Sequence, residues 1–143
     1  MIDGTEELLV EREGDIVTLT LNRPKVMNAM TSKMFADFGE ICRQVNADSS
    51  IRVLVIDGAG GNFCSGADVG AQAARATGEE PSVPLRNLRM INSSALALHE
   101  IQHPVIAKVH GVAPGAGLNL ALGCDLVYAA DTARFSEIFA RRG

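Results

Sequence analysis

The segment 111–125, which reads GVAPGAGLNLALGCD, is the feature that most narrows what this chain can fold into. It follows the apolar run Val105–Val109, which predicts a strand, and it opens a helix with Gly115, Ala116 and Gly117. Residues this small at a helix start let a ligand come close to free backbone N–H groups. Those donors, with the positive end of the helix dipole, can hold negative charge that develops on a substrate oxygen. A tight turn that needs small residues only for packing is the alternative interpretation.

A second turn of small residues, at 58–68 (GAGGNFCSGAD), follows another apolar run, Val53–Ile56. It also offers backbone N–H groups with little side-chain cover, at Gly66, Ala67 and Asp68. Two such turns could each direct one donor at a single oxygen, which is the geometry of an oxyanion hole. Each donor in such a site lowers the reaction barrier by about 3 kcal/mol.

Neither turn has the pattern of a phosphate-binding loop. No G-K-[ST] follows Gly58, and the pair Gly115 and Gly117 has Leu120 where a dinucleotide-binding fingerprint needs a third Gly or Ala. The sequence therefore gives poor support to a nucleotide or dinucleotide site.

Composition and charge limit the classes of protein to which this chain can belong. At 143 residues, with 47% hydrophobic and 21% charged residues, the chain is expected to form one domain, 1–143, with a real core. A net charge of −4 and only 4% aromatic residues argue against a nucleic-acid partner. No apolar run approaches the roughly 20 residues of a membrane span, and the acidic N-terminus lacks a signal-peptide pattern. The scattered Cys42, Cys64 and Cys124 indicate reduced cysteines, no metal site and a cytoplasmic protein.

Strand and helix patterns alternate along the chain, which predicts an α/β fold without an internal domain linker. Leu8–Arg12 and Ile16–Leu21 alternate around Gly14-Asp15 and predict a β-hairpin. Thr31 is the expected cap of a helix. The predicted buried positions of that helix are Met34, Phe38, Ile41 and Val45.

Further along, Arg52–Asp57 predicts a strand buried on both faces, and residues 70–84 predict a mobile loop. Pro104 is expected to end the next helix and to start the strand Val105–Val109, and a last strand is expected at Leu126–Ala129. The predicted buried face of the helix before Pro104 comprises Leu88, Ile91, Ala95 and Leu98.

His99-Glu-Ile-Gln-His103 matches the H-E-x-x-H pattern of zinc hydrolases. That function needs both histidines on one continuous helix, with Glu100 as general base. Pro104 follows His103 directly and disfavours helical geometry there, so the helix is expected to end at His103 or earlier. Zinc hydrolysis stays a remote alternative, a surface role is expected for His103, and no metal ligand is assigned.

Several segments together resemble one known family, the crotonase superfamily of enoyl-CoA hydratases and isomerases. The resemblance runs from about residue 7 to the end of the chain, and the segments occur in the family's order. They are Leu21-Asn-Arg-Pro24 with Asn28-Ala29, Phe63-Cys-Ser-Gly-Ala-Asp68, Pro104-Val-Ile-Ala-Lys-Val-His-Gly111, and Gly115-Ala-Gly-Leu-Asn-Leu-Ala-Leu-Gly-Cys-Asp125.

This resemblance implies a spiral of β-β-α units that lacks the family's C-terminal helical region. It implies an acyl-CoA substrate, no cofactor, and a homotrimer or hexamer. Ala67 and Ala116 match the family's oxyanion donors, while Asp68 and Asp125 are expected to cap or orient backbone. The residues expected to bind the acyl-CoA are Lys25, Val26, Met27, Ala29, Ser65, Ala67, Asp68, Val69, Gly115 and Ala116.

The catalytic side chains depart from the hydratase pattern. Asn119 and Phe139 occupy the positions of the two hydratase glutamates, and neither can transfer a proton near neutral pH. Glu137 lies two residues from the second position and is expected on another helix face. Isomerase-type chemistry is therefore favoured over hydration, with Asn119 as a hydrogen-bonding group in the acyl pocket. A non-catalytic acyl-CoA-binding or scaffold protein is the alternative.

Relatives in this family are substantially longer, so the resemblance covers their N-terminal portion. Their C-terminal region completes the acyl pocket and much of the trimer contact. Apolar surface is therefore expected to be bare on this chain.

Overall fold

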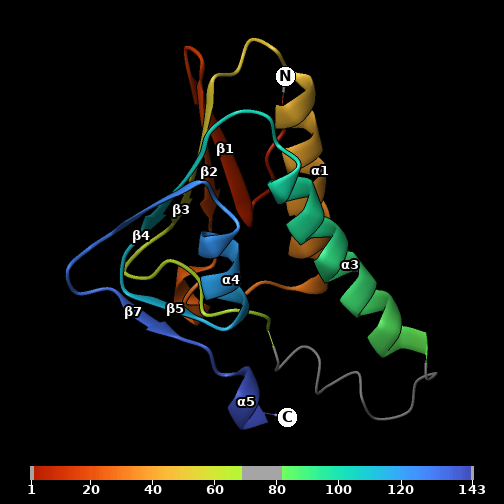
Figure 1. The fold of residues 1–143 in the computed structure, drawn as a ribbon, viewed down its shortest axis with the longest axis vertical. Coiled ribbons are helices and arrows are strands. Elements are labelled where there is room, and N and C mark those ends of the chain that lie inside the picture. Colours follow the sequence, from red (N-terminus) through yellow and green to blue (C-terminus); the bar gives the residue numbers. More distant parts are fainter. Residues whose placement is uncertain (1, 69–81, 143) are drawn as a thin grey trace.

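The computed structural model describes residues 2–68 and 82–142 (Figure 1). Strands and helices alternate along the chain, which confirms the predicted α/β class. The strands are β1 (Leu8–Glu13), β2 (Ile16–Leu21), β3 (Val53–Gly58), β4 (Val105–Val109), β5 (Val112–Pro114), β6 (Leu126–Ala129) and β7 (Arg134–Ser136). The helices are the 3-10 turn η1 (Pro24–Val26), α1 (Ser32–Ala47), α3 (Ser82–His99), α4 (Ala116–Leu122) and α5 (Phe139–Arg142).

Five strands form one sheet in the order β1-β2-β3-β4-β6, and β5 pairs with β7 in a second, two-stranded sheet. The β1–β2 pair is antiparallel and turns at Gly14, whose φ of 63° suits glycine, so the predicted hairpin is confirmed. The other pairs in the large sheet are parallel. The element order repeats strand, strand, helix in β4–β5–α4 and again in β6–β7–α5.

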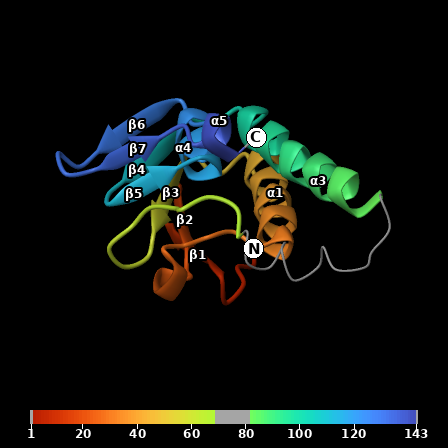
Figure 2. The same ribbon diagram turned by 90° about the horizontal axis from the view of Figure 1, so that it is seen from below.

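Helices α1 and α3 pack against each other on the same side of the large sheet (Figures 1 and 2). The core lies between these helices and the sheet, where the inward residues of β1 to β4 are buried. The expectation that β3 is buried on both faces is wrong, because Leu54 and Ile56 are buried while Val53 and Val55 are half-buried. No helix among the described residues is long and apolar enough to cross a membrane.

Helix α1 begins where the sequence predicts. The Thr31 hydroxyl oxygen accepts a hydrogen bond from the Met34 N–H at 3.1 Å, which satisfies one of the free donors at the helix start. All four predicted positions are buried, and so are Phe35, Gly39 and Cys42.

Helix α3 ends before Pro104 as predicted, but it differs from its prediction at its start and on its buried face. It begins at Ser82, inside the segment expected to be a loop, and ends at His99, before Pro104. The rest of that expected loop, up to residue 81, lies outside the described residues. Leu88 and Ala95 are exposed, whereas Ser94 and Ala97 are buried beside Leu98.

The close approach of α1 to α3 explains the shifted face of α3. A Cβ on Gly39 would lie 3.2 Å from the Cα of Ser94, so a small side chain is needed at the crossing. The Ser94 hydroxyl donates to the Ile91 carbonyl at 2.7 Å, which offsets the cost of burying it. A pattern of apolar residues alone cannot identify such a contact.

The edge strand β6 has an exposed apolar surface. All four of its residues are exposed. The exposed large apolar side chains near it in sequence are Leu122, Leu126, Val127, Tyr128, Phe135 and Phe139.

The three cysteines are buried, free thiols. Burial raises the pKa of Cys42 and Cys124 to about 12 and that of Cys64 to about 11. We therefore expect Ellman's reagent to label none of them rapidly in the native protein at pH 8, and to label all three in denaturant. Rapid labelling of any thiol without denaturant would contradict this packing.

Because these pKa values are raised, the thiols' contribution to stability is present below the pKa of an unfolded thiol. It is lost as the pH rises from there toward 11 to 12.

Candidate active site

The two glycine-containing turns lie against each other. A Cβ on Gly66 would lie 3.2 Å from the Pro114 carbonyl oxygen and 3.5 Å from the Ala116 nitrogen. A Cβ on Gly117 would lie only 2.0 Å from the Cys64 carbonyl oxygen. The Cys64 N–H also donates to the Val112 carbonyl at 3.2 Å. The residues before Ala67 and around Ala116 therefore form one closely packed region.

The Ala67 N–H points away from its neighbouring segment. Ala67 forms a parallel bridge with Met30, in which the Met30 N–H donates to Gly66 and the Asp68 N–H donates to Met30. In this pattern the middle residue turns its own N–H to the other side. No hydrogen bond joins the N–H of Ala67 or Ala116 to any acceptor in the described ranges 2–68 and 82–142.

Gly115 makes the turn before α4. Its φ of 53° and ψ of −123° are readily adopted only by glycine. Its N–H donates to the Ser136 carbonyl at 2.8 Å, and its carbonyl accepts from the Asn119 N–H at 3.0 Å. Ala116 is therefore the first residue of α4, where a backbone N–H has no partner within the helix.

The segment 25–29, expected to bind coenzyme A, runs beside the 63–68 turn. The Ser65 N–H donates to the Met27 carbonyl at 2.8 Å, and its hydroxyl contacts the Val26 carbonyl at 3.2 Å. Lys25, Val26 and Met27 are exposed. This arrangement brings the predicted residues of the two segments together, except Val69, which lies outside the described residues.

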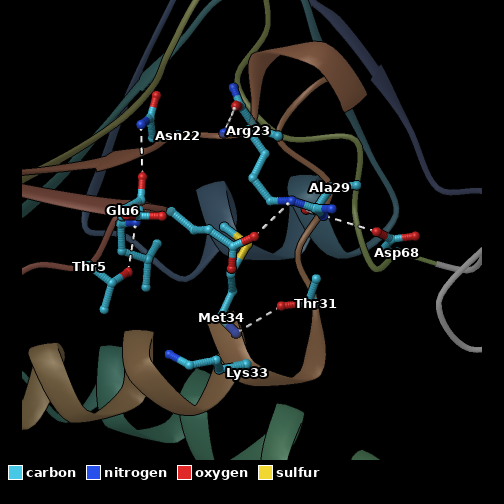
Figure 3. A network of polar contacts seen from close by, with 12 residues as sticks. Thr5, Glu6, Asn22, Arg23, Ala29, Thr31, Lys33, Met34 and Asp68 are labelled. Atoms are coloured by element: carbon cyan, nitrogen blue, oxygen red, sulfur yellow. Dashed lines mark hydrogen bonds and ion pairs between the residues drawn. The ribbon is translucent and has the colours of Figure 1, made fainter.

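Arg23 connects the same two segments through its side chain (Figure 3). Its Nη1 donates to the Ala29 carbonyl at 2.6 Å and to the Asp68 carboxylate at 2.9 Å, and its Nε lies 3.1 Å from Glu7. Asp68 thus forms an ion pair with the Arg23 side chain. Asp125 orients backbone, because its carboxylate accepts from the Val105 N–H at 2.8 Å.

Asn28 is fully buried and joins the strand exit to the glycine turn. Its side-chain nitrogen donates to the carbonyls of Asn62 at 2.7 Å, Ala59 at 2.9 Å and Phe63 at 3.2 Å. Its side-chain oxygen accepts from the Arg23 N–H at 2.8 Å. The sequence motif includes Asn28 and Arg23 but identifies none of these partners for their side chains.

Asn119 and Phe139, the residues expected at the two hydratase glutamate positions, lie near the Gly115 turn. Asn119 is exposed on α4, and a Cβ on Gly115 would lie 3.8 Å from the Phe139 ring. Glu137 is exposed and precedes α5, so the expectation that it lies on a helix is wrong. Phe139 brings an apolar ring, with no proton to transfer, beside the turn.

The H-E-x-x-H segment does not lie on one helix, because α3 ends at His99. Its Glu100 follows the helix, and His103 is half-buried with no hydrogen-bond partner for Nε2 in the part of the chain that the structure describes. His103 is therefore only partly at the surface, with its Nε2 atom buried. Among the described residues no group of three or more His, Cys, Asp or Glu could hold a metal ion.

Known proteins resemble this chain over nearly all of its length. The sequence model of the enoyl-CoA hydratase/isomerase family matches residues 11–143. The 1,2-epoxyphenylacetyl-CoA isomerase of Escherichia coli (strain K12) is 40% identical over 138 residues, which are 96% of this chain and 53% of that protein.

Solved structures show the same likeness. An enoyl-CoA hydratase from Mycobacterium smegmatis superposes with a TM-score of 0.88 at 34% identity, covering 96% of this chain and 52% of that one. An enoyl-CoA hydratase/isomerase from Marinobacter aquaeolei gives a TM-score of 0.83 at 36% identity, covering 92% and 51%. The chain thus spans about half the length of these relatives.

These likenesses confirm the crotonase-like fold that the four sequence segments imply. The matched region includes both glycine-containing turns and the strand exit that carries Arg23 and Asn28. The chain belongs to the enoyl-CoA hydratase/isomerase family.

Proposed function

We propose that this protein binds an acyl-CoA thioester and stabilises the enolate of that thioester between the N–H groups of Ala67 and Ala116. The observation that carries the proposal is the contact between the two turns, with both N–H groups unbonded within the described ranges. A donor that makes no internal hydrogen bond can bond a substrate oxygen without first breaking a bond within the protein. Neither donor needs a side chain, which suits a scaffold on which several reactions occur.

The coenzyme A portion is proposed to run along the segment 25–29. Lys25, Val26, Met27 and Ala29 contribute from this segment, and Lys25 meets a phosphate. Ser65, Asp68 and Val69 follow from the neighbouring turn, and Gly115 completes the set beside Ala116. Exposure of residues 25–27 beside Ser65 supports this path.

Isomerisation is proposed over hydration. Asn119 lines the acyl pocket as a hydrogen-bonding group, and Phe139 replaces the second glutamate with an apolar ring. Hydration requires activated water, which neither residue can deprotonate. An isomerase needs the same enolate and an acid that moves a proton between carbons, and we assign that acid to none of the described residues.

The wider context follows from the family. We propose a cytoplasmic enzyme of fatty-acid or related acyl-CoA metabolism that needs no cofactor and assembles as a homotrimer or hexamer. The second candidate is a non-catalytic acyl-CoA-binding protein, which Asn119 and Phe139 favour. Turnover of a 3-enoyl-CoA thioester by the purified protein would exclude this second candidate.

Replacing Ala116 with proline tests the donor directly. Proline is well tolerated at the first position of a helix, so Ala116→Pro removes the N–H while preserving α4. We expect turnover to fall about 100- to 1,000-fold, as when one oxyanion donor is lost. Ala116→Gly keeps the N–H and is expected to retain most of the turnover.

Steady-state kinetics on a 3-enoyl thioester and binding of a non-hydrolysable acyl-CoA measure the two properties separately. Undiminished turnover in Ala116→Pro would show that this donor is not used. Absence of saturable acyl-CoA binding by the unmodified protein would defeat the proposed function as a whole.

A further inference from the structure

The Arg23 side chain is placed where it can control the Ala67 peptide. It donates to the Ala29 carbonyl at 2.6 Å and to the Asp68 carboxylate at 2.9 Å. Ala29 directly precedes Met30, and Asp68 directly follows Ala67. Met30 and Ala67 are the bridged pair between the two segments. Arg23 therefore forms hydrogen bonds to both segments, 25–29 and 63–68, immediately beside the bridge (Figure 3).

The direction of the Ala67 N–H depends on this bridge. The peptide groups on either side of Ala67 are fixed through Met30, by the Gly66 carbonyl at 2.8 Å and the Asp68 N–H at 2.9 Å. If Asp68 or Ala29 moved, these bonds would tilt and the Ala67 N–H would turn with them. An oxyanion donor must be aimed at the charged oxygen to be effective.

We propose that Arg23 is a positioning residue that fixes the direction of the Ala67 N–H by holding Ala29 and Asp68 together. This inference rests on the proposed function, because it assigns Arg23 to the aim of a donor in the proposed oxyanion hole. Arg23 does not touch the acyl group in this role.

The surroundings of Arg23 favour positioning over binding of an anionic part of the substrate. Its side chain is 22% exposed and lies against two carboxylates, those of Glu7 and Asp68. Two negative charges around one guanidinium leave no net positive charge to attract a phosphate. The planar guanidinium has five N–H donors in fixed directions and can bond a carbonyl and two carboxylates at once. A lysine ammonium is a compact charge on a flexible stem and does not fix its partners in the same directions.

The test measures how strongly the bound carbonyl is polarised. The probe is a non-hydrolysable acyl-CoA in which a methylene replaces the thioester sulfur and the carbonyl carbon is ¹³C. Infrared difference spectra record the carbonyl stretch, which shifts to lower frequency when the oxygen accepts hydrogen bonds. We expect Arg23→Gln to bind the probe saturably but to lose at least half of the shift seen with the unmodified protein.

Glu7→Gln is the matched control, because it removes one ion pair of Arg23 and leaves the contacts to Ala29 and Asp68. We expect it to keep the full shift. Arg23→Lys, which retains the charge, is expected to recover part of the shift and serves as the test variant if Arg23→Gln does not fold.

The outcomes separate this inference from the proposed function. A full shift in Arg23→Gln, or in Arg23→Lys where Arg23→Gln does not fold, overturns the positioning role and leaves the oxyanion hole intact. Equal losses of shift in the Arg23 variant and in Glu7→Gln also overturn it, because they indicate general loosening. Probe that binds the unmodified protein without any shift overturns the oxyanion hole, and the positioning role with it.

Discussion

Replacing Asn28 with aspartate is expected to destabilise the protein by about 3–5 kcal/mol, the range for an uncompensated buried charge. The side chain is fully buried, and its nitrogen donates to three backbone carbonyls, of Ala59, Asn62 and Phe63. Asn28→Asp keeps the shape but replaces the donor with a carboxylate oxygen that faces those carbonyls. Each carbonyl then loses its partner, and the new oxygen is repelled.

Two further variants separate charge from shape. Asn28→Gly keeps the backbone conformation, since the φ of 57° suits glycine, and removes the hydrogen bonds without adding an acceptor. It is expected to cost about 1–3 kcal/mol, the range for unsatisfied buried groups. Asn22→Asp removes one similar hydrogen bond, to the Glu6 carbonyl at 2.8 Å on the exposed surface, and is expected to cost less than about 1 kcal/mol.

Chemical denaturation with urea, followed by circular dichroism, measures these three free energies of unfolding. The order expected is Asn28→Asp most destabilised, then Asn28→Gly, then Asn22→Asp. If Asn28→Asp were no less stable than Asn28→Gly, the three carbonyls would not be held by the Asn28 nitrogen.

The elements governed by local patterns could be predicted from the sequence. The hairpin at Gly14 and the α1 helix after Thr31 follow from alternation, capping and helical spacing. The face of α3 could not, because Ser94 is buried where Gly39 lets the two helices approach. The apolar run of β3 predicts burial on both faces, whereas α1 and α3 lie on the same side of the sheet and Val53 and Val55 are only half-buried.

The candidate site likewise has features that the sequence predicts and features that only the structure reveals. Small residues after apolar strands indicate two turns with accessible N–H groups, because the signal lies within a few consecutive residues, and the family resemblance implies Ala67 and Ala116 as the donors. The roles of Arg23 and Asn28 depend on partners far away in sequence, such as Asp68 and Asn62. A charged Arg and a buried Asn show no periodicity, and only the folded chain brings their partners close.

Replacing Gly117 with alanine is also expected to destabilise the protein strongly. Gly117→Ala would place a Cβ 2.0 Å from the Cys64 carbonyl oxygen, far inside contact distance. Both atoms belong to, or are fixed by, the backbone, so no side-chain rotation relieves the clash. Overpacking of this kind costs about 1–3 kcal/mol, and we expect a loss of about 3 kcal/mol.

The sign of the stability change in Gly117→Ala distinguishes two effects. The close contact between the turns predicts destabilisation, whereas helix propensity predicts stabilisation. Gly117 lies within α4, where alanine alone would stabilise a helix by about 1 kcal/mol. Gly61→Ala is the matched control, because nothing lies within 4 Å of a Cβ there, and it is expected to change stability by less than about 0.5 kcal/mol. Urea denaturation gives both values.

Relief of the Gly117→Ala clash requires the 58–68 turn and the start of α4 to separate, which moves the Ala67 and Ala116 N–H groups apart. Folded Gly117→Ala protein is therefore expected to bind the carbonyl-labelled acyl-CoA analogue with a smaller infrared shift than Gly61→Ala. A Gly117→Ala protein as stable as the unmodified chain, with an unchanged shift, would show that the two turns do not need their close contact. The proposed hole depends on that contact, because two donors polarise one oxygen only when both lie within hydrogen-bonding distance of it.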